Sequence, residues 1–269
     1  MSITEDGLKK NQANFASLSP LSFLERTRKT FPNQTAIEYK NYKLSYNEAG
    51  KRCDALANLI KNYNFNSGST IAVMLPNIPV MWECHFGIPM ATGVLNAINT
   101  RLDSYTVQFI LEHGEAKLFI YDSEYSFIIE KAIEKLDNPP ILIEFVDEVA
   151  GNKRSNFANK VNCLDYETEL KKFIDTKFDH VLPNDEWQAI SLSYTSGTTG
   201  NPKGVVYHHR GAYLNAIGNS LTWDLPMHPK YLWTLPMFHC NGWCFPWTCL
   251  LYTSPSPRDQ RGSRMPGSA

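Results

Sequence analysis

The sequence has almost no net charge and no long apolar run. It contains 26 Lys and Arg residues against 27 Asp and Glu residues, which gives a formal net charge of −1. Such a chain offers no basic surface to a nucleic acid, so we expect no nucleic-acid partner. The longest apolar stretch, from Ile78 to Leu95, is interrupted by Pro79, Glu83, His85 and Pro89. Because prolines and polar side chains interrupt this stretch, we expect no membrane span.

Cysteine is also scarce, and it is not arranged for metal or disulfide chemistry. The six cysteines form no C-x-x-C pair, although Cys240 and Cys244 lie near His208, His209 and His239 in the sequence. The N-terminal residues are polar and lack the apolar core of a secretory signal. We therefore expect reduced thiols in a cytoplasmic protein, and no zinc site. A hydrophobic content of 43%, with 12% aromatic residues, excludes a disordered chain.

Apolar periodicity predicts an α/β fold with a largely parallel sheet. Two short β-like runs, 35–39 and 42–46, form a hairpin, and Ser45 with Glu48 forms a capping box that starts a helix. After Gly68, apolar runs typical of buried strands alternate with amphipathic stretches typical of helices. We expect strands at 70–75, 117–122, 141–146, 187–194 and 204–209, and helices at 78–91, 105–113 (ending at Gly114), 125–136 and 210–221.

The other segments have less regular patterns. Residues 148–186 are polar, and we expect a surface excursion with one weak helix at 166–174. A further strand is expected at 231–236, after which Asn241 would cap a helix. At residues 253–269 the composition changes abruptly to Ser, Pro, Arg and Gly inside an apolar run. This tail resembles the translation of a sequencing adapter, with an ordinary disordered terminus as the alternative.

The most informative stretch is SYTSGTTGNPKG, residues 193–204, which lies between two expected strands. Its glycines leave backbone N–H groups open, and its hydroxyls and single lysine add further donors and a positive charge. These groups together are typical of a loop that binds a polyphosphate. The loop is not a Walker A sequence, because Pro202 precedes Lys203 and Gly204 follows it, where that pattern needs Gly and then Ser or Thr.

The string YTSGTTGNPKG resembles the signature loop of the adenylate-forming superfamily, which includes acyl-CoA synthetases, adenylation domains and luciferases. The string YLWTLPMFHCNGWCFPW (231–247) resembles the second core motif of acyl-CoA ligases. NEAGKRCDALANLI and the stretch from TIAVMLPN to NAINTRL resemble their N-terminal region. The resemblance implies the N-terminal part of the acyl-CoA synthetase fold, without its C-terminal lid domain. The expected regions are a flexible N-terminus (1–20), a truncated AMP-binding domain (21–252) and a disordered, non-native tail (253–269).

The resemblance implies an ATP-dependent acyl-CoA ligase. Such enzymes join a carboxylic acid to AMP, release diphosphate, and then transfer the acyl group to the thiol of coenzyme A. The implied cofactors are ATP, Mg²⁺ and coenzyme A. The implied acid is a short- or medium-chain fatty acid, or a small acid such as 3-methylthiopropionate. An aryl-acid adenylase and a non-catalytic nucleotide-binding remnant are the alternatives.

The resemblance also gives expectations for the activity of this chain alone, its oligomeric state and its location in the cell. Because members of the family are much longer, this chain alone is expected to be inactive. A homodimer of the longer parent is a further expectation. A peroxisomal location is the alternative to the cytoplasm, since a C-terminal address would lie in the missing part.

By the same resemblance, individual residues receive roles. Thr195 would lie near Mg²⁺, and Lys203 and His239 would act in catalysis. The acid would lie near His239, Asn241 and Trp243. Trp243 resembles a residue at the mouth of an acyl tunnel, with a plain core aromatic as the alternative. Four residues after His239, it would share a helical face with that histidine. The phosphates would be bound by Thr195, Ser196, Gly197, Thr198, Thr199, Gly200 and Lys203.

Overall fold

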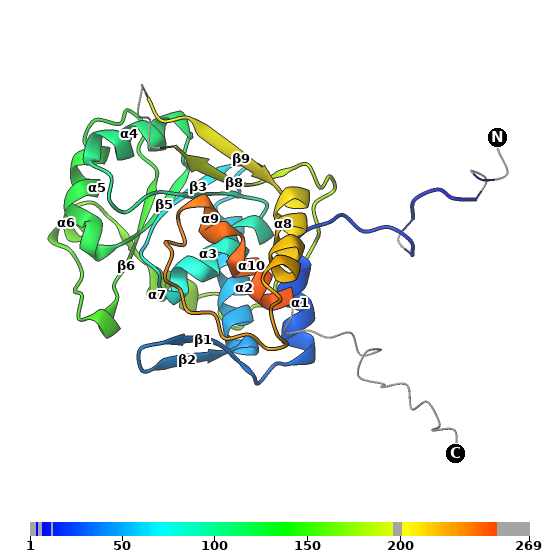
Figure 1. The fold of residues 1–269 in the computed structure, drawn as a ribbon. Coiled ribbons are helices and arrows are strands. Elements are labelled where there is room, and N and C mark those ends of the chain that lie inside the picture. Colours follow the sequence, from blue (N-terminus) through cyan, green and yellow to red (C-terminus); the bar gives the residue numbers. More distant parts are fainter. Residues whose placement is uncertain (1–3, 5–6, 12, 196–200, 252–269) are drawn as a thin grey trace, which may run out of the picture.

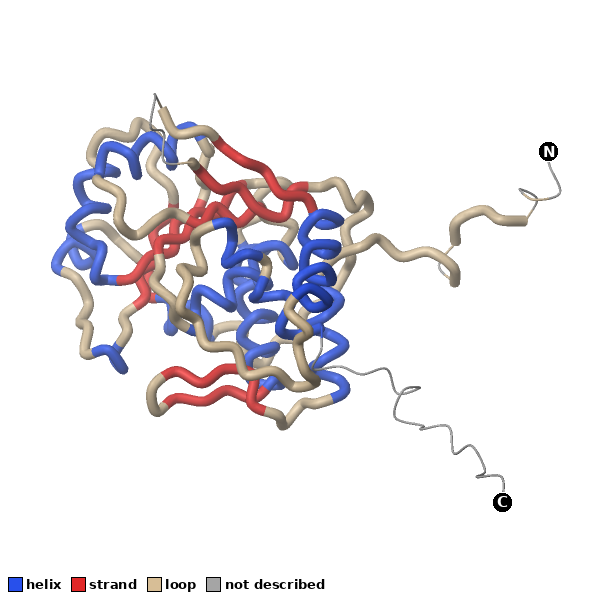
Figure 2. The backbone as a smooth tube through the Cα atoms, viewed as in Figure 1, coloured by secondary structure: helices blue, strands red, loops and turns tan. Residues whose placement is uncertain are grey.

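The computed structural model describes residues 4, 7–11, 13–195 and 201–251 of the chain. Within them, a seven-stranded sheet is covered by helices on both faces (Figures 1 and 2). Its neighbours run parallel, except that the last two strands are antiparallel. The predicted α/β fold with a largely parallel sheet is therefore confirmed. The strand order is β7 (Leu164–Asp165), β6 (Ile141–Phe145), β5 (Leu118–Asp122), β3 (Thr70–Met74), β4 (Val94–Ala97), β8 (Ala189–Tyr194) and β9 (Gly204–His208).

Each central strand sends alternate side chains into two separate cores. On β3, Ile71 and Val73 pack into one core, and Ala72 and Met74 pack into the other, as the two-residue period of a strand requires. The first core is covered by α1 (Leu21–Thr30), α2 (Tyr46–Asn62), α3 (Pro79–Met90), α7 (Tyr166–Lys171), α8 (His209–Thr222) and α10 (Phe245–Leu251). The second core is covered by α4 (Ser104–His113), α5 (Ser126–Ile133) and α6 (Asn156–Lys160). None of the described helices is both long and apolar enough to cross a membrane.

The N-terminal hairpin and the start of α2 form as predicted. β1 (Thr35–Tyr39) and β2 (Tyr42–Ser45) pair antiparallel. Ser45 Oγ accepts a hydrogen bond from Glu48 N at 3.3 Å, and Glu48 Oε2 accepts one from Ser45 N at 2.8 Å. This capping box satisfies two backbone donors that the helix itself cannot satisfy. The predicted apolar face of α2 is buried, namely Cys53, Leu56, Ala57 and Ile60.

One predicted helix has different ends in the structure, and another ends where it was predicted to end. The helix expected over 125–136 is shorter, because α5 ends at Ile133 and is preceded by the 3₁₀ turn η1 (Ser123–Tyr125). Gly114 does end α4, but its φ is −81°, so it needs no left-handed backbone; Glu115 takes the positive φ of 50° instead. Glycine is needed at 114 because a Cβ there would lie 2.7 Å from the carbonyl oxygen of Ile110.

The prediction that 148–186 is only a surface excursion is wrong. The helix expected at 166–174 does form, as α7, but the segment also adds the edge strand β7 to the sheet, together with α6 and the short 3₁₀ turn η2 (Glu148–Ala150). Tyr166, Leu170 and Phe178 are buried in the first core. The strand escaped prediction because it has only two residues, too few to show a period.

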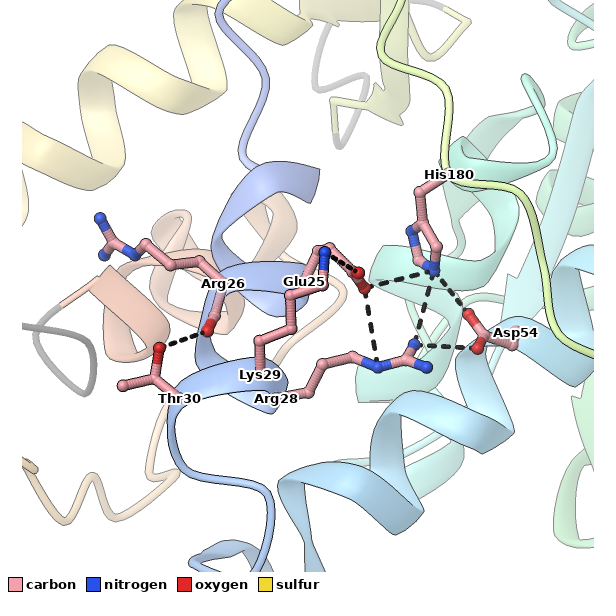
Figure 3. Close-up of polar contacts among 7 residues, drawn as sticks. All are labelled: Glu25, Arg26, Arg28, Lys29, Thr30, Asp54 and His180. Carbon is pink, nitrogen blue, oxygen red and sulfur yellow. Dashed lines mark hydrogen bonds and ion pairs between the residues drawn. The ribbon is translucent and has the colours of Figure 1, made fainter. Parts of the chain in front are cut away.

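The end of this segment is held to helices α1 and α2 by a cluster of charged side chains (Figure 3). His180 Nε2 lies 2.8 Å from Asp54 Oδ1, and Arg28 donates to Asp54 Oδ2 at 2.9 Å. Glu25 adds a second carboxylate, 3.6 Å from both Arg28 and His180. The Asp54 side chain is only 4% exposed. These partners, and not water, therefore stabilise the buried carboxylate.

We expect Asp54→Ala to lower the free energy of unfolding by about 1–3 kcal/mol, because it removes the nearest carboxylate of the half-buried Arg28 and His180 and leaves them only the more distant Glu25. The matched control is Lys29→Ala. Lys29 binds Glu25 of the same cluster, but its side chain is 72% exposed, so we expect a loss of about 0–0.5 kcal/mol. Urea unfolding of the 269-residue chain measures both values. Equal losses in the two variants would contradict the role given to Asp54.

Candidate functional site

The predicted phosphate loop connects two antiparallel strands that are hydrogen-bonded up to the start and the end of the loop. Tyr194 of β8 lies opposite Gly204 of β9 in the antiparallel register. Beyond them, Thr195 N donates to Lys203 O at 3.0 Å, and Lys203 N donates to Thr195 Oγ1 at 3.2 Å. Both residues are exposed, so the Lys203 ammonium is free to meet a ligand. The other predicted phosphate-binding residues lie outside the described part of the chain: Ser196, Gly197, Thr198, Thr199 and Gly200.

The carboxyl end of β8 is fixed to helix α4. Tyr194 Oη and His113 Nδ1 are hydrogen-bonded at 2.8 Å. The Phe109 ring stacks on His113, with centroids 5.2 Å apart, and meets Tyr194 edge-on at 6.5 Å. Burial raises the pKa of Tyr194, so its hydroxyl stays neutral and able to donate. The residue directly before the loop therefore has a defined position.

The strand predicted at 231–236 is absent, and the side chain of Asn77 takes the place of a partner strand. Asn77 Nδ2 donates to Leu235 O at 2.7 Å, and Met237 N donates to Asn77 Oδ1 at 2.8 Å. One amide thus satisfies two backbone groups that a sheet would otherwise pair. Leu232 is 81% exposed, which agrees with an extended segment outside the sheet.

Asn241 does not cap a helix, as the sequence had suggested; it lies inside the helical turn α9 (Cys240–Trp243), with His239 in the N-cap position. Its side chain is fully buried, and Ser193 Oγ donates to its Oδ1 at 3.0 Å. His239 is exposed. The structure therefore brings the predicted acid-binding segment against the strand that enters the phosphate loop.

The turn that carries Trp243 is left-handed. Cys240, Asn241, Gly242, Trp243 and Cys244 have φ values of 46°, 43°, 57°, 55° and 65°. The prediction that His239 and Trp243 share one face of an α-helix is therefore wrong, because the right-handed spacing does not apply. Trp243 is 52% exposed, so within this chain it is not a core aromatic.

These features meet at one edge of the sheet. Asn77 follows the end of β3, and Ser193 and Thr195 lie at the end of β8, while β4 lies between these two parallel strands. The segment from Leu235 to Asn241 contacts Asn77, just beyond β3, and Ser193 on β8, and so crosses this carboxyl edge. Ligands of open α/β sheets bind outside the carboxyl ends of the strands. Lys203, His239 and Trp243 all face the solvent beside this edge.

Two positioning residues, Asn77 and Asn219, were not predicted from the sequence. Asn219 Nδ2 donates to the carbonyl oxygen of Trp243 at 2.6 Å. Asn77 could have been noticed, because a polar residue directly after a buried strand marks the carboxyl edge. Asn219 lies within α8 and carries no such signal.

The residues present fit a magnesium ion only in part. The Thr195 hydroxyl is exposed and accepts one hydrogen bond, from Lys203 N, so it can supply one oxygen ligand. Among the described residues, no group of three His, Cys, Asp or Glu side chains could hold a metal. Mg²⁺ commonly keeps several waters and binds phosphate oxygens beside one or two protein oxygens, and a single hydroxyl is compatible with that pattern.

The fold matches solved structures of adenylate-forming ligases. A putative long-chain-fatty-acid CoA ligase from Rhodopseudomonas palustris matches with a TM-score of 0.74 and 17% identity, over 88% of this chain and 56% of that one. The O-succinylbenzoate coenzyme A synthetase from Bacillus subtilis, in complex with AMP, matches with a TM-score of 0.66 and 20% identity, over 86% and 53%. At these identities the likeness shows the fold alone.

The chain belongs to the AMP-binding enzyme family, which matches residues 24–254. An acetate–CoA ligase of Humulus lupulus is 42% identical over 249 residues, which are 90% of this chain and 44% of that protein. A peroxisomal acetate/butyrate–CoA ligase of Arabidopsis thaliana is 39% identical over 93% of this chain and 45% of its own length. The resemblance to the adenylate-forming superfamily is thus confirmed. The chain spans less than half the length of these relatives.

Proposed function

We propose that the chain supplies the phosphate- and acid-binding part of an ATP-dependent acid–thiol ligase. The reaction would convert an acid, ATP and coenzyme A into acyl-CoA, AMP and diphosphate through an acyl-adenylate. The observation that carries the proposal is the loop base: Thr195, directly after β8, and Lys203, directly before β9, bond each other. Ser193, two residues earlier, contacts the segment that bears His239 and Trp243. Family membership and the names of the relatives support the same reaction.

Each residue has a proposed task. Mg²⁺, when bound, would share the charge of the phosphates, with Thr195 Oγ1 as one oxygen ligand. The Lys203 ammonium would hold the phosphates through charge-assisted hydrogen bonds and stabilise the charge that develops on diphosphate. Ser196, Gly197, Thr198, Thr199 and Gly200 would complete the loop. His239 would lie beside the acid carboxylate, and Asn241 and Trp243 would shape the pocket that receives the acyl chain.

We propose a short aliphatic acid as the substrate. Relatives are named for acetate, for butyrate and for 2-methylpropanoate. Other relatives are named for trans-cinnamate and benzoate. An assay should therefore compare the rates with short aliphatic acids and the rates with aryl acids. Small functionalised acids such as 3-methylthiopropionate fall within the proposed class. Medium-chain fatty acids, which the sequence resemblance also implied, belong in the same assay series.

We propose a peroxisomal location in place of the cytoplasmic one expected from the N-terminal sequence. The support is the word "peroxisomal" in the names of several relatives. Homodimerisation of a longer parent stays a prediction, and sedimentation of the active enzyme would measure it.

The proposal is tested with a chimaera, because the chain spans 44% of the Humulus lupulus relative. Residues 1–252 are joined to the part of that ligase that follows the matched region. With ATP, Mg²⁺ and coenzyme A, we expect the chimaera to form AMP and the thioester from acetate or butyrate faster than from benzoate. The 269-residue chain alone should form neither, since catalysis needs pre-positioned charge in a water-excluded site. ATP binding by the chimaera without acyl-adenylate formation would favour a non-catalytic nucleotide-binding protein instead.

A further inference from the structure

We infer that the left-handed turn 240–244 is a rigid connection between the phosphate loop and the acid site, and that Ser193 is the positioning residue that couples them. The inference rests on the proposed function for its consequence in catalysis. The geometry on which it stands, the left-handed backbone and its hydrogen bonds, is independent of that function.

The turn cannot hold its shape without support. Four of its five residues are not glycine, yet all five have φ between 43° and 65°. This region brings the Cβ of an L-residue close to its own backbone, so each such residue costs free energy. Such strain persists only where the surroundings fix it, and it is common at functional sites.

The first support comes from the phosphate-loop strand. Ser193 Oγ donates to Asn241 Oδ1 at 3.0 Å, and Asn241 is fully buried. Asn241 Nδ2 has no hydrogen-bond partner among the described residues, so the bond from Ser193 is the side-chain contact that fixes this amide. Ser193 is on β8, and only Tyr194 separates it from Thr195, which forms the base of the loop with Lys203.

The second support holds the other end of the turn. Asn219 Nδ2 donates to Trp243 O at 2.6 Å, and Thr248 Oγ1 donates to Cys244 O at 2.9 Å. Between the two supports, Gly242 packs so closely that an added Cβ would lie 2.9 Å from the Trp233 ring. With both ends fixed, the turn acts as a rigid body, and among the described residues Ser193 hydrogen-bonds it to β8, the strand that enters the phosphate loop.

A rigid connection of this kind couples two ligands. A nucleotide that displaces the end of β8 would also displace Asn241, and through the rigid turn the neighbouring His239 and Trp243. An acid bound at His239 should therefore favour nucleotide binding by the same factor, because such coupling is reciprocal. Removing the Ser193 hydroxyl should weaken this coupling without removing any group that touches the reacting atoms.

The strand offers a matched control. Ser191 lies on the same strand two residues earlier; its hydroxyl is buried and has no hydrogen-bond partner among the described residues. Ser191→Ala and Ser193→Ala remove the same atom from neighbouring positions, and only the second breaks the bond to Asn241. Ser193→Thr keeps a hydroxyl and serves as the rescue variant.

The first measurement uses the 269-residue chain itself and needs no activity. Gly242 N bonds His239 O at 2.9 Å, and Cys244 N bonds Asn241 O at 3.1 Å, so hydrogen exchange of these two amides reports on the turn. We expect Ser193→Ala to speed their exchange by about 10-fold or more, since local opening becomes easier, and Ser191→Ala to leave it unchanged. Equal exchange in the two variants would overturn the inference.

The second measurement uses the chimaera. Loss of one hydrogen bond should raise the acid KM by about 5-fold in Ser193→Ala, abolish the lowering of that KM by ATP, and change kcat little. Ser193→Thr should restore the parent values. A lower melting temperature with unchanged acid KM would mean that Ser193 has only a structural role, and the coupling would be refuted. An inactive parent chimaera would count against the proposed function, while the exchange result would still decide on the turn.

Discussion

Lys203→Ala should slow acyl-adenylate formation in the chimaera by about 10- to 1000-fold, because the loop loses its single ammonium. In 193–204 no other residue carries a positive charge, so no neighbour in the loop can replace it. The backbone groups of Lys203 make the two bonds to Thr195, and alanine keeps both groups. The loop base should therefore survive, and the loss should report on the side chain.

The rate is measured by acid-dependent exchange of labelled diphosphate into ATP, which follows the first half-reaction alone. Lys230→Ala is the control, since Lys230 is also exposed but lies outside the loop; it should exchange at the parent rate. Lys203→Arg keeps the charge and should recover part of the loss, although its planar group fits a point contact less well. Exchange at the parent rate in Lys203→Ala would remove the role assigned to the loop.

The sequence predicted those elements whose causes are local. Five strands of the sheet, β3, β5, β6, β8 and β9, follow from apolar runs, whereas β4 and β7 were not predicted. Helix α2 begins directly after its N-cap Ser45, because Ser45 and Glu48, three residues apart, form a capping box. Thr195 and Lys203 could be placed at a loop base because both expected strands flank them. The core alternation of β3 likewise needs only the strand period.

The failures have non-local causes. The run 231–236 has a strand-like composition, but its hydrogen-bond partner is Asn77, more than 150 positions earlier. The left-handed backbone at 240–244 could not be predicted from a segment whose only glycine is Gly242, because contacts with Ser193, Asn219 and Trp233 impose it. Local patterns therefore define the scaffold, while distant side chains determine how the acid-binding segment lies on it.

Glu83 is the clearest case of a residue that a local pattern cannot interpret. In the sequence it only interrupts an apolar stretch, yet its side chain is fully buried in α3. Arg52 of α2 donates to both of its oxygens, at 2.5 and 3.2 Å, and Tyr166 Oη donates to it at 2.8 Å. Arg52 also binds Glu167, at 2.6 and 3.0 Å. One guanidinium therefore joins α2, α3 and α7.

Arg52→Ala should lower the free energy of unfolding of the 269-residue chain by about 3–5 kcal/mol, the usual cost of leaving a buried charge without its partner. Urea denaturation measures this value. The control is Lys43→Ala, which breaks an exposed pair whose side chains are 62% and 54% exposed; we expect about 0–1 kcal/mol there. The double variant Arg52→Met with Glu83→Leu removes both charges and should be more stable than Arg52→Ala, because no unpaired carboxylate stays buried. If Arg52→Ala cost no more than Lys43→Ala, or if the double variant were the less stable of the two, the buried ion pair would not be what holds the three helices together.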